Sequence, residues 1–179
     1  MKYSDPARPS PEGEVIAQAA AELYRTQKAN IFLIFANTVI GGVRECDILI
    51  DRLVMLGVPK GALIVDPAAD TTYGEFEAFA RYAREHALGD AAVLSIEAKR
   101  DRLPSIAKRE NFFPTIYWAE DVLWESSDKS LRDFVEGWRH APRHFLMRVK
   151  LGILPIIVMW IDPHARIQRT IARLLRHQK

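Results

Sequence analysis

The chain has 179 residues, of which 49% are hydrophobic and 27% are charged. These proportions are those of an ordinary globular domain, and they exclude a disordered chain and a fibrous repeat. A formal net charge of +2 gives no global reason to expect a nucleic-acid partner. The single cysteine, Cys46, excludes an internal disulfide and every cysteine-rich metal site, and it fits a reducing compartment. We therefore expect a cytoplasmic protein of one domain.

No segment has the pattern of a membrane span or a secretion signal. Residues 1–14 carry charges and prolines where a signal peptide needs an apolar stretch. The longest apolar run, residues 151–161, is about half the roughly 20 residues that a spanning helix requires. We expect neither secretion nor a transmembrane helix.

Helical and strand patterns alternate in the first half of the chain. Pro11 opens a helix that is expected to reach about Gln27, because apolar residues recur there at helical spacing. The apolar run at residues 31–36 predicts a strand that is covered on both faces. A helix over residues 44–56 and a strand over residues 62–66 follow.

The same alternation continues toward the middle of the chain. Thr71 or Thr72 is expected to cap the next helix, with Glu75 completing a capping box. Strands are predicted at residues 91–96 and 114–118, with a short helix at 101–109 between them. Such alternation predicts a three-layer αβα fold with a doubly wound, mainly parallel, Rossmann-like sheet, whose strands at 31–36, 62–66 and 91–96 are neighbours.

The predicted organisation has three parts. Residues 1–10 form a loose lead-in, residues 11–125 form the α/β domain, and residues 126–179 form a helical C-terminal region packed on that domain or extending from it. Within this last region, prolines 142, 155 and 163 are expected to break the helices.

Residues 56–109 and the segment before them resemble the YdcF-like family, which includes the SanA and ElyC envelope proteins. The resemblance rests on a helix that ends in a leucine and Gly-Val-Pro, on a threonine at a helix start, and on an arginine after a strand. The matching residues are Leu53, Gly57, Val58, Pro59, Thr72 and Arg102, with Gly41, Gly42 and Glu45 near the glycine loop of that family. The resemblance implies a Rossmann-like domain that binds a small molecule.

Several polar positions depart from the family pattern. Glu75 stands where the family has asparagine, Thr71 replaces another asparagine, and Lys99 replaces a histidine. The first strand of the family has no counterpart in residues 1–14. These departures favour a divergent member in which catalysis is lost, while the retained Glu45, Thr72 and Arg102 keep an active member open.

The predicted topology places one candidate site outside the carboxyl ends of the strands. The residues expected to surround a common pocket for an anionic ligand are Asn37, Gly41, Gly42, Glu45, Thr72, Glu75, Lys99 and Arg102. All of these residues except Asn37 have a structural alternative as well. The two glycines form a tight turn, Glu45 interacts favourably with the dipole of its helix, Thr72 and Glu75 form a helix cap, and the basic residues form a solvated loop.

No catalytic set or metal site is predicted, and no cofactor can be named. The five histidines show no trusted metal-ligand spacing with a carboxylate or with one another. Cys46 is expected to be buried packing rather than a nucleophile. The four tryptophans are expected to be core or interface anchors.

A basic amphipathic helix is predicted at residues 163–177, with apolar residues on one side and arginines on the other. It either packs on the body of the protein, lies on an anionic membrane surface, or mediates a homodimer. Three classes of function therefore stay open. They are an anion-binding YdcF-like protein with a nucleotide-like or envelope-precursor ligand, a relative without catalysis, and an interaction or peripheral membrane module.

Overall fold

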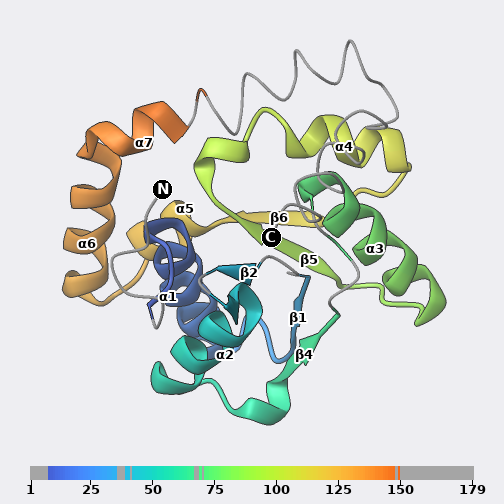
Figure 1. Ribbon diagram of the computed structural model, residues 1–179, viewed down its shortest axis with the longest axis horizontal. Helices are drawn as coiled ribbons and strands as arrows, with labels where there is room; N and C mark the ends of the chain where they lie inside the picture. The colour runs from blue at the N-terminus through green and yellow to red at the C-terminus, as the bar shows by residue number, and fades with distance from the viewer. Residues whose placement is uncertain are drawn as a thin grey trace.

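The computed structural model describes residues 8–35, 39–40, 42–66, 69, 71–147 and 149, and it shows a mixed α/β protein (Figure 1). Two of the predicted site residues, Asn37 and Gly41, lie outside the described residues. The amphipathic helix predicted at residues 163–177 lies outside them as well, as do two of the three prolines expected to break the C-terminal helices.

Two of the helices begin at a residue whose hydroxyl caps them. Helix α1 (Pro11–Arg25) has Ser10 at its N-cap, whose hydroxyl accepts a hydrogen bond of 3.0 Å from the amide of Gly13. Proline at the first helical position costs nothing there because the amide would be unpaired in any case. Helix α3 (Thr72–Glu85) is capped in the same way by Thr71, whose Oγ1 accepts from the amide of Gly74 at 3.0 Å.

Four strands form two parallel pairs. Strand β1 (Phe32–Ile34) pairs with β4 (Leu63–Val65), and β5 (Ala92–Ser95) pairs with β6 (Thr115–Trp118). The predicted strands and their parallel direction are therefore confirmed within each pair. The predicted single sheet is not found, because no ladder joins β1 or β4 to β5 in the described part of the chain.

Side-chain packing connects the two pairs where backbone hydrogen bonds do not. Leu94 of β5 packs against two core clusters. One involves β1, β4, α1 and α2 (Glu45–Met55), and the other involves α1, α5 (Ala119–Trp124) and α6 (Lys129–His140). Strands of three or four residues offer few ladder bonds, so apolar burial carries the contact between the pairs. On the other face of β5, Val93 packs with Phe76 of α3 and Ile106 of α4 (Leu103–Glu110).

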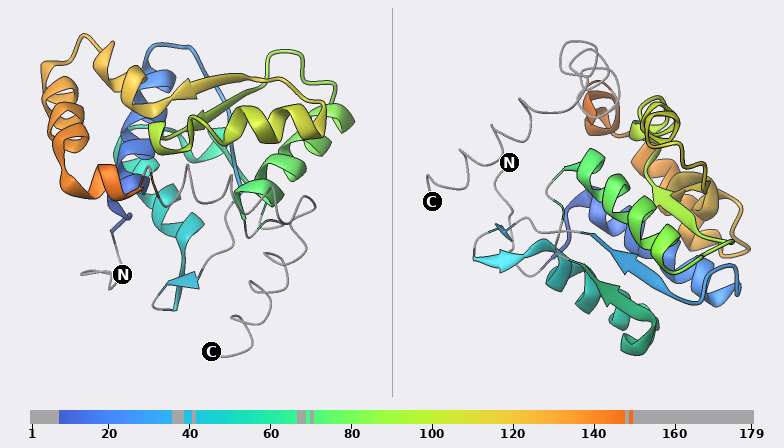
Figure 2. Two further views of the ribbon diagram at one scale, coloured as in Figure 1. Left: turned by 90° about the horizontal axis from the view of Figure 1, so that it is seen from above. Right: turned by 90° about the vertical axis from the view of Figure 1, so that its right-hand side faces the viewer.

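Helices therefore cover both faces of the β5–β6 pair, as predicted (Figure 2). The β1–β4 pair is different. Its residues Phe32, Ile34 and Leu63 pack toward α1 and α2, whereas Ile64 on the opposite face is 39% exposed. The prediction of helices on both faces is thus confirmed for the β5–β6 pair. It is not confirmed for the β1–β4 pair, although the apolar run at residues 31–36 had predicted a strand covered on both faces. The larger three-layer arrangement is not confirmed.

A short antiparallel hairpin, β2 (Val39–Ile40) and β3 (Val43–Arg44), precedes helix α2 (Glu45–Met55). The sequence prediction placed a simple turn here. Gly42 lies in the turn of the hairpin with φ +84°, a conformation that favours glycine. Its position is explained by the turn, which was the structural alternative for this residue.

The remaining elements follow the predicted order with three additions, which are two 3-10 helices and a helix directly after β6. These elements are the 3-10 helices η1 (Lys60–Ala62) and η2 (Glu97–Lys99) and the α-helices α4 (Leu103–Glu110), α5 (Ala119–Trp124), α6 (Lys129–His140) and α7 (Pro142–Met147). Helix α5 directly after β6 and the hairpin before α2 were not predicted. Among the described residues, none of the helices has the length and apolar character needed to cross a bilayer.

Candidate functional site

Four of the predicted site residues come together in space. The carboxyl of Glu75 interacts electrostatically with Glu45, Lys99 and Arg102. Lys99 in turn interacts with Glu12. We call these five residues, Glu12, Glu45, Glu75, Lys99 and Arg102, the strand-end cluster. Glu12 was not among the predicted site residues.

The strand-end cluster lies where helices begin. Glu12 and Glu45 are in the first turns of α1 and α2, Glu75 is in the first turn of α3, and Arg102 is the N-cap residue of α4. Lys99 ends η2, just after strand β5. The electrostatic contacts among these residues therefore bring four helix N-termini to one region. Each N-terminus adds partial positive charge from its unpaired amides.

Burial shifts the protonation of the cluster. Desolvation raises the pKa of Glu45, although the charge of Lys99 opposes the shift. Desolvation likewise raises the pKa of Glu75, against the charges of Lys99 and Arg102. It lowers the pKa of Lys99. Desolvation in this region thus disfavours the charged form of the glutamates and of the lysine.

The charges of the cluster are not closed into ion pairs. Over the described ranges, no hydrogen bond or salt bridge links the Lys99 ammonium or the Arg102 guanidinium to a carboxylate of the cluster. Arg102 is only 6% exposed, and its Nε has no hydrogen-bond partner. The Oε2 atom of Glu12 is also buried without a partner. A buried guanidinium nitrogen without an acceptor is costly, and an added anion would relieve that cost.

The capping explanation for Glu75 does not hold. Because Thr71 is the N-cap, the capping-box position falls on Gly74, and the Glu75 amide instead donates to the Thr71 carbonyl at 2.8 Å. Thr72 occupies the first helical position and makes no cap hydrogen bond in the described structure. The predicted Thr72–Glu75 box is therefore wrong, and the Glu75 side chain is left to the cluster.

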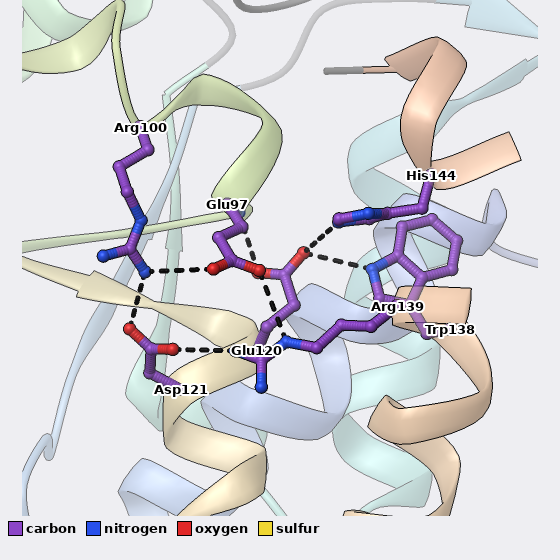
Figure 3. Close-up of polar contacts among 7 residues, drawn as sticks. All are labelled: Glu97, Arg100, Glu120, Asp121, Trp138, Arg139 and His144. Carbon is purple, nitrogen blue, oxygen red and sulfur yellow. Dashed lines mark hydrogen bonds and ion pairs between the residues drawn. The ribbon is translucent and has the colours of Figure 1, made fainter. Parts of the chain in front are cut away.

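A second charged network was missed by the sequence prediction. It contains Glu97, Arg100, Glu120, Asp121, Trp138, Arg139 and His144 (Figure 3). Glu97 follows strand β5 and Glu120 follows strand β6, so position after a strand was the signal that could have found them. His144 belongs to α7, and nothing in its spacing from the two glutamates indicates that they meet.

The remaining predictions concern Cys46 and the tryptophans. Cys46 is fully buried, as expected for a packing residue, and burial raises the pKa of its thiol. Trp138 is 8% exposed and belongs to the core. Trp124, by contrast, is 49% exposed, so it is not a core anchor, and the interface alternative for it stays a prediction.

A cavity of about 260 Å³ lies away from the strand-end cluster. It is lined by residues near the ends of α1 and α5, among them Arg25, Lys28 and Ser126. None of the predicted site residues that the structure describes lines it. The cavity is therefore no support for the predicted pocket.

Comparison of the chain with protein-family models, with curated proteins and with solved structures finds no match. The resemblance to the YdcF-like family thus rests only on the residues given above. The arrangement of the strand-end cluster has to be interpreted from its own chemistry.

Proposed function

We propose that this protein binds an anionic small molecule at the strand-end cluster, with Lys99 and Arg102 holding its negative group. The observation that carries the proposal is the buried Nε of Arg102, which has no partner. Arginine and lysine at a desolvated site bind phosphate or carboxylate strongly because the interaction is not weakened by water. The helix N-termini that meet here favour the same sign of ligand.

The carboxyls narrow the class of ligand. Glu45 and Glu75 lie within electrostatic reach of the cations, so the ligand has to offer hydrogen-bond donors beside its anionic group. Nucleotides and phosphorylated sugars have both. A nucleotide-like or envelope-precursor ligand is also what the resemblance to the YdcF-like family implies. The proposal concerns binding and assigns no catalytic step.

A thermal-shift panel tests the proposal with the full chain. Nucleotides, S-adenosylmethionine, sugar phosphates and inorganic phosphate are the probes. A ligand present at 100 times its Kd should stabilise the fold by about 2.7 kcal/mol. The Lys99→Met and Arg102→Met variants should lose that stabilisation. Lys108→Met, an exposed lysine of α4, is the matched control and should keep it.

Three results would contradict the proposal. The first is a flat response of the unchanged protein to the whole panel. The second is a ligand that stabilises the Lys99→Met and Arg102→Met variants as strongly as the unchanged protein, because binding would then take place elsewhere. The third is a response to all polyanions that disappears with added salt, because it indicates surface attraction.

A further inference from the structure

Three side chains with metal-ligating atoms converge in the network of Figure 3. They are Glu97 of η2, Glu120 of α5 and His144 of α7, and one ligand atom of each lies within 4.8 Å of the others. The three elements are far apart in sequence, so the fold itself brings the atoms together. This cluster is distinct from the strand-end cluster.

The imidazole of His144 is the first indication of a ligand. The residue is 7% exposed, and its Nε2 is buried without a hydrogen-bond partner. Figure 3 shows the ring directed toward the carboxylate of Glu120, and Nε2 lies 3.7 Å from Oε1 of that residue. That separation is too long for a hydrogen bond. Two ligands of a tetrahedral zinc ion lie roughly 3.4 Å apart, given metal–ligand distances of about 2.1 Å.

Glu120 is held in a fixed orientation. Its side chain is fully buried, its Oε2 accepts from the amide of Glu97 at 2.8 Å, and its Oε1 accepts from Trp138 Nε1 at 3.1 Å. Hydrogen bonds of this kind orient the ligating carboxylates of metal sites. The second lone pair of Oε1 stays available to a ligand that lies between it and His144.

Glu97 is held weakly enough to bind a cation. Its carboxylate lies 3.4 Å from Arg100 and 3.3 Å from Arg139. The same two guanidinium groups contact Asp121 at 2.7 Å and 2.8 Å. The arginines therefore keep their short contacts with Asp121 if one oxygen of Glu97 turns toward an ion.

From this geometry we propose that Glu97, Glu120 and His144 bind a divalent transition-metal ion of the Zn²⁺ class. One imidazole and two carboxylates suit such ions better than Mg²⁺ or Ca²⁺, which prefer oxygen ligands alone. The side chain of Glu97 is 25% exposed, so a water molecule can complete the coordination from that side. The ion would fasten α7 to the ends of strands β5 and β6.

The test uses the full chain after dialysis against EDTA. Calorimetric titration with Zn²⁺ should show one ion bound per chain, and Co²⁺ should give the visible absorption of a low-symmetry site. His144→Gln and Glu97→Gln should each weaken Zn²⁺ binding at least about tenfold. The matched controls are His86→Gln at the C-cap of α3 and Glu136→Gln on α6, both exposed, and they should bind Zn²⁺ as the unchanged protein does.

Several outcomes would overturn the site. Absence of saturable binding is one, and unchanged affinity in both His144→Gln and Glu97→Gln is another, since the ion would then be elsewhere. A third is that His144→Gln is less stable than the unchanged protein in EDTA, while Zn²⁺ changes the melting temperature of neither protein. That result assigns His144 and Glu120 to an ion pair. If His144→Gln does not fold, Glu97→Gln decides, because its melting temperature in EDTA shows whether the fold is intact.

Discussion

The two charged groups on either side of η2 differ in how their charges are paired. In the network around Glu120, both carboxylate oxygens accept hydrogen bonds, and two arginines are shared between Glu97 and Asp121. In the strand-end cluster, the Nε of the buried Arg102 has no acceptor. Removal of one member of a buried pair leaves its partner unsatisfied and costs stability, whereas a buried charge without a partner already carries that cost, which a bound ligand can offset.

One short turn separates the two groups. Glu97 and Lys99 lie at the two ends of η2, and Ala98 between them is buried in the core. This turn therefore places the Glu97 carboxylate in the network around Glu120 and the Lys99 ammonium in the strand-end cluster. The difference predicts effects of opposite sign when a charge is removed from each side.

The largest effect is expected on the paired side. Replacement of Glu120 by alanine leaves Trp138 Nε1 and the amide of Glu97 without their acceptor in a buried place. We expect a loss of about 3 kcal/mol in the free energy of unfolding, measured by urea denaturation. The exposed Glu136→Ala on α6 is the control and should change stability by less than about 0.5 kcal/mol. A similar loss in the free energy of unfolding for both variants would show that the hydrogen bonds of Glu120 do not stabilise the fold.

Removal of a charge from the unpaired side should have the opposite sign. In Lys99→Met, a thioether of similar length replaces an ammonium that burial disfavours and that closes no ion pair in the described residues. We expect the ligand-free protein to gain roughly 1 to 2 kcal/mol. For a chain of this size, each kcal/mol raises the melting temperature by roughly 2–4 °C. A lower melting temperature would mean that Lys99 serves the fold rather than a ligand.

The sequence predicts local structure well where one residue type carries the signal. Ser10 with Pro11 marks the start of α1, and the apolar runs mark β1, β4 and β5. It does not predict how strands associate, because pairing depends on distances between segments far apart in the chain. Leu94 packs against both core clusters, yet no ladder joins β5 to β1 or β4 in the described chain.

Some residues of the candidate site could be predicted from the sequence, and others could not. The predicted topology placed Glu45, Glu75, Lys99 and Arg102 in one region, and the four residues do interact, although no ladder joins the two strand pairs that precede them in the described chain. Glu12 was missed because a glutamate in the first turn of a helix is already explained by the helix dipole. His144 was missed because α7 reaches Glu120 through the packing of α6 and Trp138, which no spacing in the sequence encodes.

A smaller effect tests whether Glu75 is free of a capping role. Thr71→Ala removes the hydroxyl that accepts from the Gly74 amide, and it should cost about 1 kcal/mol. Thr72→Ala removes no cap and should cost less than about 0.5 kcal/mol. Thermal unfolding of the two variants side by side measures the difference. A larger loss in Thr72→Ala would restore the capping box and with it a structural explanation of Glu75.

The smallest effect is a pH dependence whose sign distinguishes an unpaired carboxyl from a paired one. Burial raises the pKa of Glu45 above its ordinary value of 4.5, so the folded state holds the proton more tightly than the unfolded state. Ionisation of Glu45 therefore lowers stability as the pH rises from 4.5 to the raised pKa. Glu45→Gln has no carboxyl to ionise at this position. Its free energy of unfolding relative to the unchanged protein should therefore rise between pH 4.5 and the raised pKa, and it should stay constant above that pKa.

Glu14 of α1 provides the paired counterpart. Burial alone would raise its pKa, but hydrogen bonds and the charge of Arg52, 2.6 Å away, outweigh burial and hold the pKa below 4.5. This ion pair stabilises the protein above pH 4.5, and the stabilisation is lost as the pH falls through the lowered pKa. Glu14→Gln should therefore cost stability at neutral pH and approach the unchanged protein in acid. Urea denaturation from acid to neutral pH measures both variants, and equal slopes for the two would mean that Glu45 is paired as Glu14 is.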